Sequence, residues 1–362
     1  MTTSTDRYLD QAVDHALRGP DRDRNPRVGC VLVDAAGTVV ARGHHGGAGT
    51  PHAEVVALTS AGPRARGTTA YVTLEPCNHH GRTGPCARAL HEAGVTRVVY
   101  GVPDPTEHAT GGAAWLAAHG VPVEQHDHLE AQALVADWAR AAVLGRPHVT
   151  WKIASTVDGR VAAADGSSRW ITSPEARHDA HALRSRVDAI IVGTGTALAD
   201  DPALTARTPD GSSLPRQPLR VVVGHRDLPA GSRLSKDPGP ALHLRTHDPL
   251  EALDALALRG VHSVLLEGGP TLAGAFWAAG CVDELLVYLA PALLGSGRSA
   301  VPDLGITTVA DTARLELADV DRVGPDLRLR FIPLPATDQP AAAPVAVLAT
   351  DPDQPAPSLQ ED

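Results

Sequence analysis

The sequence predicts an α/β protein built from two successive domains. Its 362 residues exceed the length of one typical domain, and a hydrophobic fraction of 43% is enough to fill two cores. Short apolar runs typical of strands alternate with segments of helical pattern along most of the chain. Because such alternation produces sheets covered by helices, we expect a three-layer sandwich first and a second α/β unit after it.

The first domain is expected over residues 1–145. Its predicted elements follow one another in the order helix 6–18, strand 28–33, strand 38–42, a helix from His52, strand 70–74, helix 86–93, strand 97–102 and helix 129–144. The Gly-Arg-Pro sequence at 145–147 follows the last helix and marks the predicted boundary, because Gly and Pro interrupt regular structure.

The second domain is expected over residues 146–334. Its predicted strands are the apolar runs at 148–154, 189–193, 219–224, 241–246, 263–269, 284–290 and 328–332. After Pro333 the chain is rich in Pro and Ala, contains no Lys or Arg, and carries five acidic residues. We therefore expect residues 335–362 to form a disordered acidic tail.

Charge and cysteine content restrict the function. The net charge of -10 disfavours nucleic acid as a partner, because nucleic-acid binding needs clustered Lys and Arg, but it leaves small-molecule substrates open. Four cysteines are too few for a disulfide framework and suit thiols or metal ligands in a reducing compartment. No signal-peptide pattern and no apolar run of about 18 residues is found, so we expect a cytoplasmic protein without a membrane partner.

One constellation predicts zinc chemistry. His52 and Glu54 belong to a His-Ala-Glu sequence, and Cys77 and Cys86 follow in order within the same α/β unit. Catalytic zinc takes three protein ligands and keeps a fourth position open, so His52, Cys77 and Cys86 are the expected ligands. Glu54 is expected to transfer protons without binding the metal, as in zinc-dependent nucleobase deaminases. Taken singly, each residue could instead be a solvated histidine or a buried apolar cysteine.

The local sequence around each cysteine predicts its environment. We expect Pro76 to end a strand and Cys77 to enter the N-terminus of the next segment, where a helix dipole favours thiolate. Cys30 and Cys281 lie in apolar runs and are expected in the core. Eight residues separate the two ligand cysteines, whereas polynucleotide and cytidine-type deaminases usually have C-x-x-C.

The eight-residue insert between the ligand cysteines brings His79 and Arg82 towards the metal site. An Arg there suits a phosphate or carbonyl of a small substrate. A solvated surface loop remains an alternative for either residue alone.

A glycine-rich turn in the second domain suggests phosphate binding. Glu267 is followed by Gly268, Gly269 and Pro270, and then by a helical pattern. Backbone N–H groups at a helix N-terminus bind phosphate well, although an ordinary strand-to-helix turn would look the same. The glycines at 193–198 do not form the G-x-G-x-x-G pattern of a dinucleotide-binding fold.

Three segments, NPRVGCVLV at 25–33, GHHGGAGTPHAE at 43–54 and TLEPCNHHGRTGPC at 73–86, resemble the deaminase half of the bifunctional deaminase/reductases of riboflavin biosynthesis, the RibD or RibG family. The resemblance covers most of residues 8–104. It implies a cytidine-deaminase-like sandwich. It also implies substrate contacts from Asn25, His45, His79, Arg82 and Asp104.

Further segments resemble the reductase half of the same family over about residues 148–300: 152–162, 167–177, 192–207, 264–274 and 282–295. That half implies a dihydrofolate-reductase-like fold and NADPH. The implied cofactor contacts are Ala154, Trp170, Thr196, Asp200, Gly269, Pro270, Thr271, Leu272, Ala273, Gly274 and Ala275. The implied substrate contacts are Ser168, Arg184, Leu204, Arg207 and Glu267.

Several of these residues suit the implied chemistry. Arg184 and Arg207 could clamp a phosphate, since guanidinium binds phosphate bidentately, although either could be a surface ion pair. Lys152 and Glu267 could pair near the reacting sugar. The sequence departs from the family pattern at Gly84, Thr106, Gly111 and Gly224-His225.

The resemblance implies two consecutive reactions in a homo-oligomer. Zinc-dependent hydrolysis of diaminohydroxyphosphoribosylaminopyrimidine would release ammonia, and NADPH would then reduce the ribosyl group of 5-amino-6-(5-phosphoribosylamino)uracil to ribityl. One alternative is a secondary-metabolism paralogue acting on a related pyrimidine, which the departures at Thr106 and Gly111 motivate. The other is a nucleic-acid-editing deaminase, which the charge and the eight-residue insert disfavour.

Overall fold

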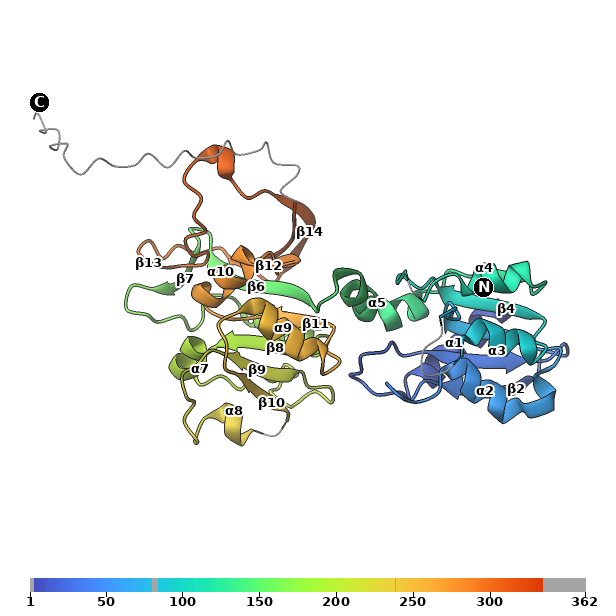
Figure 1. Cartoon of the computed structure of the whole chain (residues 1–362). Helices are drawn as coiled ribbons and strands as arrows, with labels where there is room; N and C mark the ends of the chain where they lie inside the picture. Colours follow the sequence, from blue (N-terminus) through green and yellow to red (C-terminus); the bar gives the residue numbers. More distant parts are fainter. Residues whose placement is uncertain (1–2, 80–83, 108, 238, 335–362) are drawn as a thin grey trace, which may run out of the picture.

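The computed structural model describes residues 3–79, 84–107, 109–237 and 239–334. They form two lobes, and helix α5 (Leu129–Leu144) lies where the lobes meet (Figure 1). The predicted tail at 335–362 and the candidate Arg82 lie outside the described residues. Within these described ranges, no helix has the length and apolar character needed to span a bilayer.

The first lobe is built on a five-stranded sheet in the order β2-β1-β3-β4-β5. The strands are β1 (Gly29–Val33), β2 (Val39–His44), β3 (Thr69–Leu74), β4 (Arg97–Val102) and β5 (Val123–Gln125). β1 is antiparallel to β2 and β3, whereas β3, β4 and β5 are parallel. The other elements are α1 (Ser4–Ala16), α2 (Ala53–Ala61), η1 (Gly62–Ala65), α3 (Cys86–Glu92) and α4 (Gly112–Ala118).

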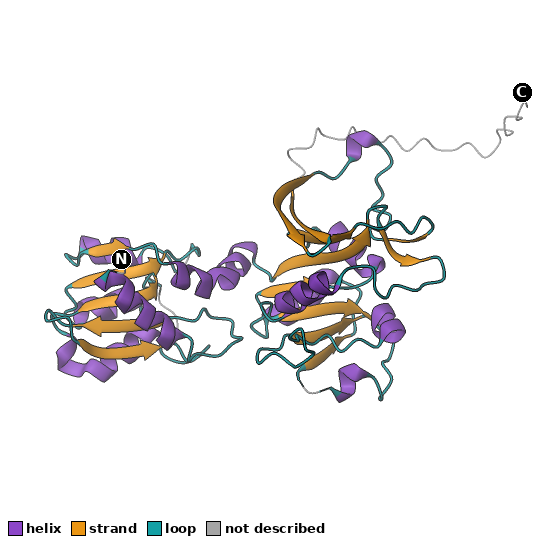
Figure 2. Ribbon diagram, turned by 180° about the vertical axis from the view of Figure 1, so that it is seen from behind, coloured by secondary structure: helices purple, strands orange, loops and turns teal. Residues whose placement is uncertain are grey.

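Strand β1 shows why helices cover both faces of this sheet. All five of its residues are buried, and successive side chains point to opposite faces. Leu32 packs with Ala57 of α2, whereas Val31 packs with Leu9 of α1. Burying one such aliphatic side chain contributes roughly 1.5–3 kcal/mol. The predicted three-layer sandwich is confirmed, and Figure 2 shows its helices on the two sides of the sheet.

The helix boundaries predicted from the sequence agree closely with those in the structure. The helix at 129–144 matches α5, and α1 begins two residues earlier than expected. The earlier start is set by a capping box, in which the Thr3 hydroxyl accepts from the Asp6 N–H (3.1 Å) and the Asp6 carboxylate accepts from the Thr3 N–H (2.8 Å). The sequence patterns did not predict α4 and β5.

The second lobe has an eight-stranded sheet in the order β10-β9-β8-β11-β6-β12-β15-β14. Its strands are β6 (His148–Thr156), β8 (Ala189–Gly193), β9 (Leu219–Val223), β10 (Ala241–Leu244), β11 (Ser263–Leu266), β12 (Glu284–Ala290), β14 (Leu315–Val323) and β15 (Asp326–Pro333). The six strands from β10 to β12 are parallel, and β15 and β14 are added antiparallel. A separate two-stranded sheet pairs β7 (Arg160–Ala163) with β13 (Gly297–Ser299).

The helices of the second lobe are α6 (Pro174–Arg184), α7 (Thr194–Asp200), α8 (Arg233–Lys236), α9 (Pro249–Ala257), α10 (Pro270–Ala278) and η2 (Val309–Asp311). The central strands are buried on both faces. Leu266 of β11 packs with Leu253 of α9 and Phe276 of α10, while Leu265 packs with Leu234 of α8 on the other face. This explains why the predicted strands of the second domain are continuous apolar runs rather than alternating patterns.

The start of α4 lies against the loop that follows β3. A Cβ atom added at Gly112 would lie 1.7 Å from the carbonyl oxygen of Pro76, so only glycine permits this approach. The buried Glu75 carboxylate accepts hydrogen bonds from the backbone N–H groups of Gly111 (3.1 Å) and Ala113 (3.0 Å). A carboxylate is favourable there because the N-terminus of a helix carries partial positive charge.

The Gly112→Ala variant tests this packing. We expect it to lower the free energy of unfolding of the first domain by about 1–3 kcal/mol, because the methyl group forces α4 away from Pro76. Gly84→Ala is the matched control, since a Cβ atom there would meet no atom of the described residues within 4 Å, and we expect a change within about 0.5 kcal/mol. Urea denaturation of both variants measures the difference, and equal stability would contradict the close approach.

Candidate functional site

An imidazole and two thiols meet at one end of the first domain. His52 is the N-cap residue of α2, Cys86 is the first residue of α3, and Cys77 lies in the loop after β3. The His52 Nδ1 atom lies 3.2 Å from the Cys86 sulfur and 3.6 Å from the Cys77 sulfur. Both cysteines are buried. Three residues from distant parts of the sequence are thus brought together, as predicted.

The expectation that Cys77 enters a helix N-terminus is wrong. Cys86 holds that position, because the chain after Pro76 continues as a loop before α3 begins. The Cys77 sulfur nevertheless accepts from the backbone N–H of Cys86 at 3.5 Å, so it shares the favourable end of α3. Hydrogen bonds from Cys86 and His52 lower the pKa of the Cys77 thiol to about 4. The contact with Cys77, together with burial, raises the pKa of the Cys86 thiol.

The donor set fits a zinc ion. The three candidate ligand atoms lie within 4.8 Å of one another. Tetrahedral zinc, with bonds of about 2.3 Å to sulfur and about 2.0 Å to nitrogen, places neighbouring donors roughly 3.5 Å apart, close to the spacing seen here. Thiolate sulfur and imidazole nitrogen are also the donors that zinc prefers.

A second group of potential ligands is of a different kind. Asp10, His128 and Glu130 also come together, but both carboxylates are exposed. The His128 imidazole accepts from the Ala131 N–H at 3.2 Å, and its Nε2 atom lies 3.1 Å from Asp10. His128 therefore serves as the N-cap of α5, which accounts for the cluster without a metal.

Glu54 stands in the first turn of α2, two residues after His52. Its side chain is only 3% exposed. Burial raises the pKa of its carboxyl to about 7, and the negative charge of Cys77 acts in the same direction. A carboxyl group that titrates near neutral pH can both accept and donate a proton, which is what a general acid–base catalyst requires.

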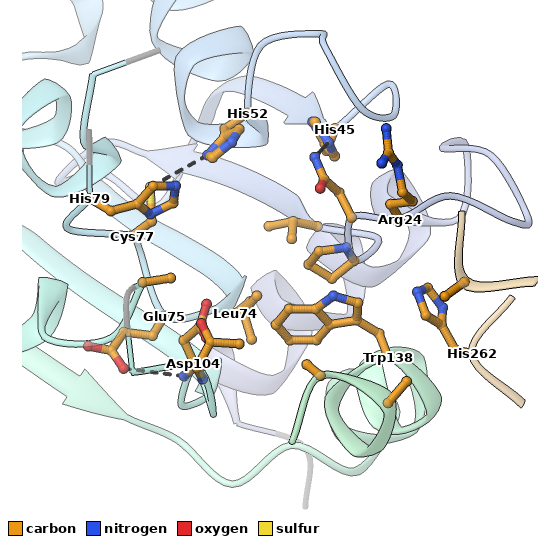
Figure 3. Close-up of a pocket in the computed structure, with 18 of the residues that line it drawn as sticks. Arg24, His45, His52, Leu74, Glu75, Cys77, His79, Asp104, Trp138 and His262 are labelled. Atoms are coloured by element: carbon orange, nitrogen blue, oxygen red, sulfur yellow. Dashed lines mark hydrogen bonds between the residues drawn. The ribbon is translucent and has the colours of Figure 1, made fainter. Parts of the chain in front are cut away.

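A cavity of about 470 Å³ opens from this cluster, and several predicted substrate contacts line it (Figure 3). His52, Cys77 and Glu54 form part of its wall. The structure also brings four of the five predicted substrate residues of this domain to the cavity: Asn25, His45, His79 and Asp104. The fifth, Arg82, lies outside the described residues.

The hydrogen bonds of His45 fix how Asn25 is oriented. The His45 Nδ1 atom lies 3.0 Å from the Pro51 carbonyl oxygen, so Nδ1 carries the proton in the neutral ring. Burial lowers the pKa of His45, which favours that neutral form. Its Nε2 atom then accepts from the Asn25 side-chain amide at 3.0 Å. No other described residue bonds to the Asn25 amide oxygen, so this acceptor is available to a substrate amino group.

The loop after β4 is organised by an acidic residue that sequence reasoning did not assign. Glu75 accepts from the Asp104 N–H at 3.3 Å, in addition to its two bonds at the start of α4. Asp104 in turn accepts from the Thr106 N–H (2.9 Å) and hydroxyl (2.6 Å). Thr106, one of the departures from the family pattern, therefore holds Asp104 in place. The Glu-Pro-Cys sequence was visible, but nothing local shows which loop Glu75 binds.

The cavity wall continues beyond the first domain. Trp138 of α5 lies on one side. Ala257 ends α9, and Val261 and His262 lie in the loop just before β11. Figure 3 shows His262 beside Trp138, at the end of the cavity away from His52. Sequence reasoning assigned no residue of the second domain to this site.

A second polar cluster lies in the second domain, at the carboxyl end of β11. Glu267 follows that strand, and Arg184 grips it bidentately, with Nε–Oε1 at 2.8 Å and Nη2–Oε2 at 2.7 Å. Burial raises the pKa of Glu267, but the charges of Arg184 and Lys152 outweigh it and bring the pKa down to about 2. Glu267 is therefore held as a carboxylate.

This geometry revises the expected phosphate clamp and the expected Lys152–Glu267 pair. The Arg184 guanidinium is committed to Glu267 and to the Thr205 carbonyl at 3.2 Å. Arg207 uses only its Nε atom, which donates to the Thr205 hydroxyl at 2.9 Å. Lys152 influences Glu267 through its charge, but its Nζ atom lies over the Tyr288 ring, 5.7 Å from the centroid. Of the two arginines, Arg207 has guanidinium donors to spare.

The predicted cofactor contacts gather at the carboxyl ends of neighbouring parallel strands. Gly269 caps α10, and its N–H donates to the Thr196 hydroxyl of α7 at 3.2 Å, which joins the ends of β8 and β11. Ala154 lies on the adjacent strand β6, and Asp200 is the last residue of α7. The remaining predicted contacts follow Gly269 in α10: Pro270, Thr271, Leu272, Ala273, Gly274 and Ala275. This edge of a parallel sheet is the usual place for ligands.

The other predicted residues of the second domain differ in exposure. Ser168 and Trp170 lie in the exposed loop between β7 and α6, and Arg169 ties this loop to the Asp200 carbonyl at 3.1 Å. The Leu204 side chain is buried with Ile190, so only its backbone could face a substrate. At the departure Gly224-His225, the Gly224 backbone packs against Thr194.

Two family models match the chain. The cytidine and deoxycytidylate deaminase zinc-binding region matches residues 2–102. The RibD C-terminal domain matches residues 147–329. Each match therefore falls on one of the two lobes.

Similar proteins extend over almost the whole chain. The riboflavin biosynthesis protein RibD of Mycobacterium tuberculosis is 49% identical over 333 residues, covering 91% of this chain and 97% of the relative. The protein of the same name from Escherichia coli is 39% identical over 361 residues, covering 90% and 98%.

Solved structures show the same likeness. Acinetobacter baumannii RibD has a TM-score of 0.71 at 36% identity and is matched over 91% of this chain and 99% of its own. A Thermotoga maritima protein described as a diaminohydroxyphosphoribosylaminopyrimidine deaminase/5-amino-6-(5-phosphoribosylamino)uracil reductase has a TM-score of 0.69 at 30% identity, with the same coverage.

Proposed function

The chain belongs to the RibD family, as a bifunctional deaminase and reductase of riboflavin biosynthesis, and we propose how its residues divide the two reactions. The first domain hydrolyses the amine of diaminohydroxyphosphoribosylaminopyrimidine, and the second reduces 5-amino-6-(5-phosphoribosylamino)uracil. These substrates are those named for the Thermotoga maritima relative. The observation that carries the first assignment is the His52–Cys77–Cys86 cluster beside a buried Glu54, at the end of a large cavity.

The metal in this proposal is zinc, held by His52, Cys77 and Cys86. Zinc bound by three such ligands lowers the pKa of a water in its open fourth position. The short contacts between the donors and the match to a zinc-binding region support this assignment. The chemistry of the side chains also supports it. Both sulfurs lie within hydrogen-bonding distance of the His52 imidazole, and the pKa of the Cys77 thiol is lowered, which favours the thiolate that zinc binds.

Glu54 moves the protons of the deamination. Its carboxylate accepts a proton from the attacking water and donates it to the departing amine, which leaves as ammonia. A bound cation would lower the pKa of Glu54 from its value of about 7, so the carboxylate form is available at neutral pH. Asn25 presents its amide oxygen to the substrate amine, and Asp104 offers a second acceptor on the cavity wall. We assign the contact with the substrate phosphate to His79 and to Arg82, the latter on the family resemblance.

The second domain binds NADPH and the deaminated uracil at the carboxyl edge of its parallel strands. The α10 N-terminus at Gly269 offers backbone N–H groups to a cofactor phosphate. Thr196, Asp200, Ala154 and Trp170 complete the proposed cofactor contacts. Arg207 binds the phosphate of the sugar substrate, while Arg184 keeps Glu267 ionised and in place beside it. Ser168 and the Leu204 backbone contact the same substrate.

The remaining expectations fit this assignment. We place the boundary between the domains at residues 145–147, in line with the family match that starts at residue 147. The four free, buried cysteines support a reducing compartment such as the cytoplasm. A homo-oligomer stays a proposal. The comparisons favour neither the secondary-metabolism paralogue nor the nucleic-acid-editing deaminase.

Zinc content tests the metal site. We expect about one zinc per chain in protein purified without chelators, and a loss of most of it in Cys77→Ser, because two remaining ligands hold zinc weakly. Cys281→Ala is the control, since Cys281 lies in the core of the second domain and should leave the zinc content unchanged. Elemental analysis measures all three proteins, and folded wild-type protein free of zinc would overturn the assignment.

The Glu54→Gln variant tests the proton transfer. The amide cannot accept the proton of the attacking water, so we expect ammonia release to fall by a factor of roughly 10²–10⁴. Zinc content and reductase activity should remain, because Glu54 is neither a ligand nor a part of the second domain. Deamination at a near-normal rate in this variant would remove Glu54 from the mechanism.

Two variants test the division of labour. Cys77→Ser should abolish ammonia release but leave NADPH oxidation intact when the deaminated uracil is supplied. Arg207→Ala should leave deamination intact and slow the reduction about 10- to 150-fold, the loss expected when one charge-assisted hydrogen bond of about 1.5–3 kcal/mol is removed.

Mixing the two variants should restore the overall conversion, because the intermediate can diffuse from one molecule to the other. If folded Cys77→Ser protein also fails to reduce supplied intermediate, the two sites do not work separately.

A further inference from the structure

The loop that carries Asn25 lies against the second domain. The Arg22 guanidinium donates to the Asp188 carbonyl at 3.1 Å. A Cβ atom added at Gly260 would lie 2.6 Å from backbone atoms of Asp23, so the two backbones touch. His262 lines the same cavity as Arg24 and Asn25. Burial lowers the pKa of its imidazole, and the nearby Arg24 backbone acts in the opposite direction. Three consecutive residues before Asn25 thus contact a domain that lies more than 160 residues away in the sequence.

The partner side of this contact is firmly held. The Asp188 side chain is only 5% exposed. Its carboxylate accepts from the backbone N–H groups of His262 (2.9 Å) and Ser263 (3.2 Å) and from the Arg216 guanidinium (2.8 Å). Asp188 and His262 are therefore parts of one hydrogen-bonded unit at the start of β8 and β11. A loop that rests on this unit is restrained by the second domain in addition to its contacts within the first domain.

On the side of the first domain, the same loop leads directly to the deaminase cavity. The Asp23 carboxylate accepts from the backbone N–H groups of Asn25 and Ala48, both at 2.9 Å. The Asn25 amide then donates to His45. Asn25, His45 and His262 all line this cavity, and Figure 3 shows Arg24 between His45 and His262.

We propose that the reductase domain positions the substrate-binding loop of the deaminase, with His262 as the positioning residue. His262 and Asp188 hold residues 22–24, and this fixes Asn25 where its amide oxygen meets the substrate amine. Holding the loop before the substrate arrives lowers the entropy that binding must otherwise overcome. The deaminase pocket is then complete only when the second domain is in place. This inference rests on the proposed deaminase function of the cavity.

The His262→Ala variant tests the proposal in the full-length, zinc-loaded chain. With diaminohydroxyphosphoribosylaminopyrimidine as substrate, we expect KM for ammonia release to rise about threefold to tenfold, because a less restrained loop must be ordered when the substrate binds. The kcat should stay within about twofold, because zinc and Glu54 are untouched. Reduction of supplied 5-amino-6-(5-phosphoribosylamino)uracil by NADPH should be unchanged. His178→Ala, an exposed histidine of α6, is the matched control and should change neither activity.

Two further variants separate positioning from a general loss of structure. Arg22→Ala removes a contact from the opposite side of the interface and should raise the same KM. His262→Gln keeps a side-chain N–H that can face the Arg24 carbonyl, and it should recover most of the wild-type KM. An unchanged KM in both His262→Ala and Arg22→Ala would overturn the proposal, as would an equal loss of reductase activity.

Hydrogen exchange supplies a readout that needs no substrate. Backbone amides of residues 22–25 should exchange faster in His262→Ala than in wild type and in His178→Ala, because the loop is released. Unchanged exchange would overturn the proposal whichever substrate the cavity binds. A wild-type chain that shows the protected loop but releases no ammonia from the pyrimidine phosphate would instead contradict the proposed function.

Discussion

The meeting of His52 with two buried sulfurs is the contact on which the chemistry of the first domain depends. It needs two helices to begin at the same place, since His52 caps α2 and Cys86 opens α3. The partial positive charge of these helix ends favours thiolate, and the lowered pKa of Cys77 reflects the hydrogen bonds it receives there. The same burial that shapes the donor set raises the pKa of Glu54. One packing arrangement thus prepares the metal ligands and the proton carrier together.

Features that depend on the order of motifs along the chain and on local residue patterns could be predicted from the sequence. His52, Glu54, Cys77 and Cys86 were found because three short motifs follow one another in one α/β unit, and the helix at 129–144 was found because its apolar spacing is regular. Glu75 and α4 were missed. The helix is short and begins at a glycine, and the role of Glu75 depends on a loop that returns to it from a distant strand.

The ion pairs of the second domain likewise could not be predicted from the sequence. A resemblance placed Arg184, Arg207 and Glu267 near one substrate, but only the fold shows that Arg184 binds Glu267 bidentately while Arg207 keeps donors free. The order of eight strands, which brings β8 and β11 side by side, cannot be derived from apolar runs that all look alike. The placement of His262 and the loop before Asn25 on one cavity is likewise a product of tertiary packing, and neither local sequence indicates it.

The account rests most heavily on the identity of the metal ligands, and X-ray absorption at the zinc edge of the holoprotein tests it most directly. The structure predicts two sulfur neighbours at about 2.3 Å together with nitrogen or oxygen neighbours at about 2.0–2.1 Å, from His52 and the open position. A shell without sulfur, or one with three or more sulfurs, would contradict the assignment of His52, Cys77 and Cys86.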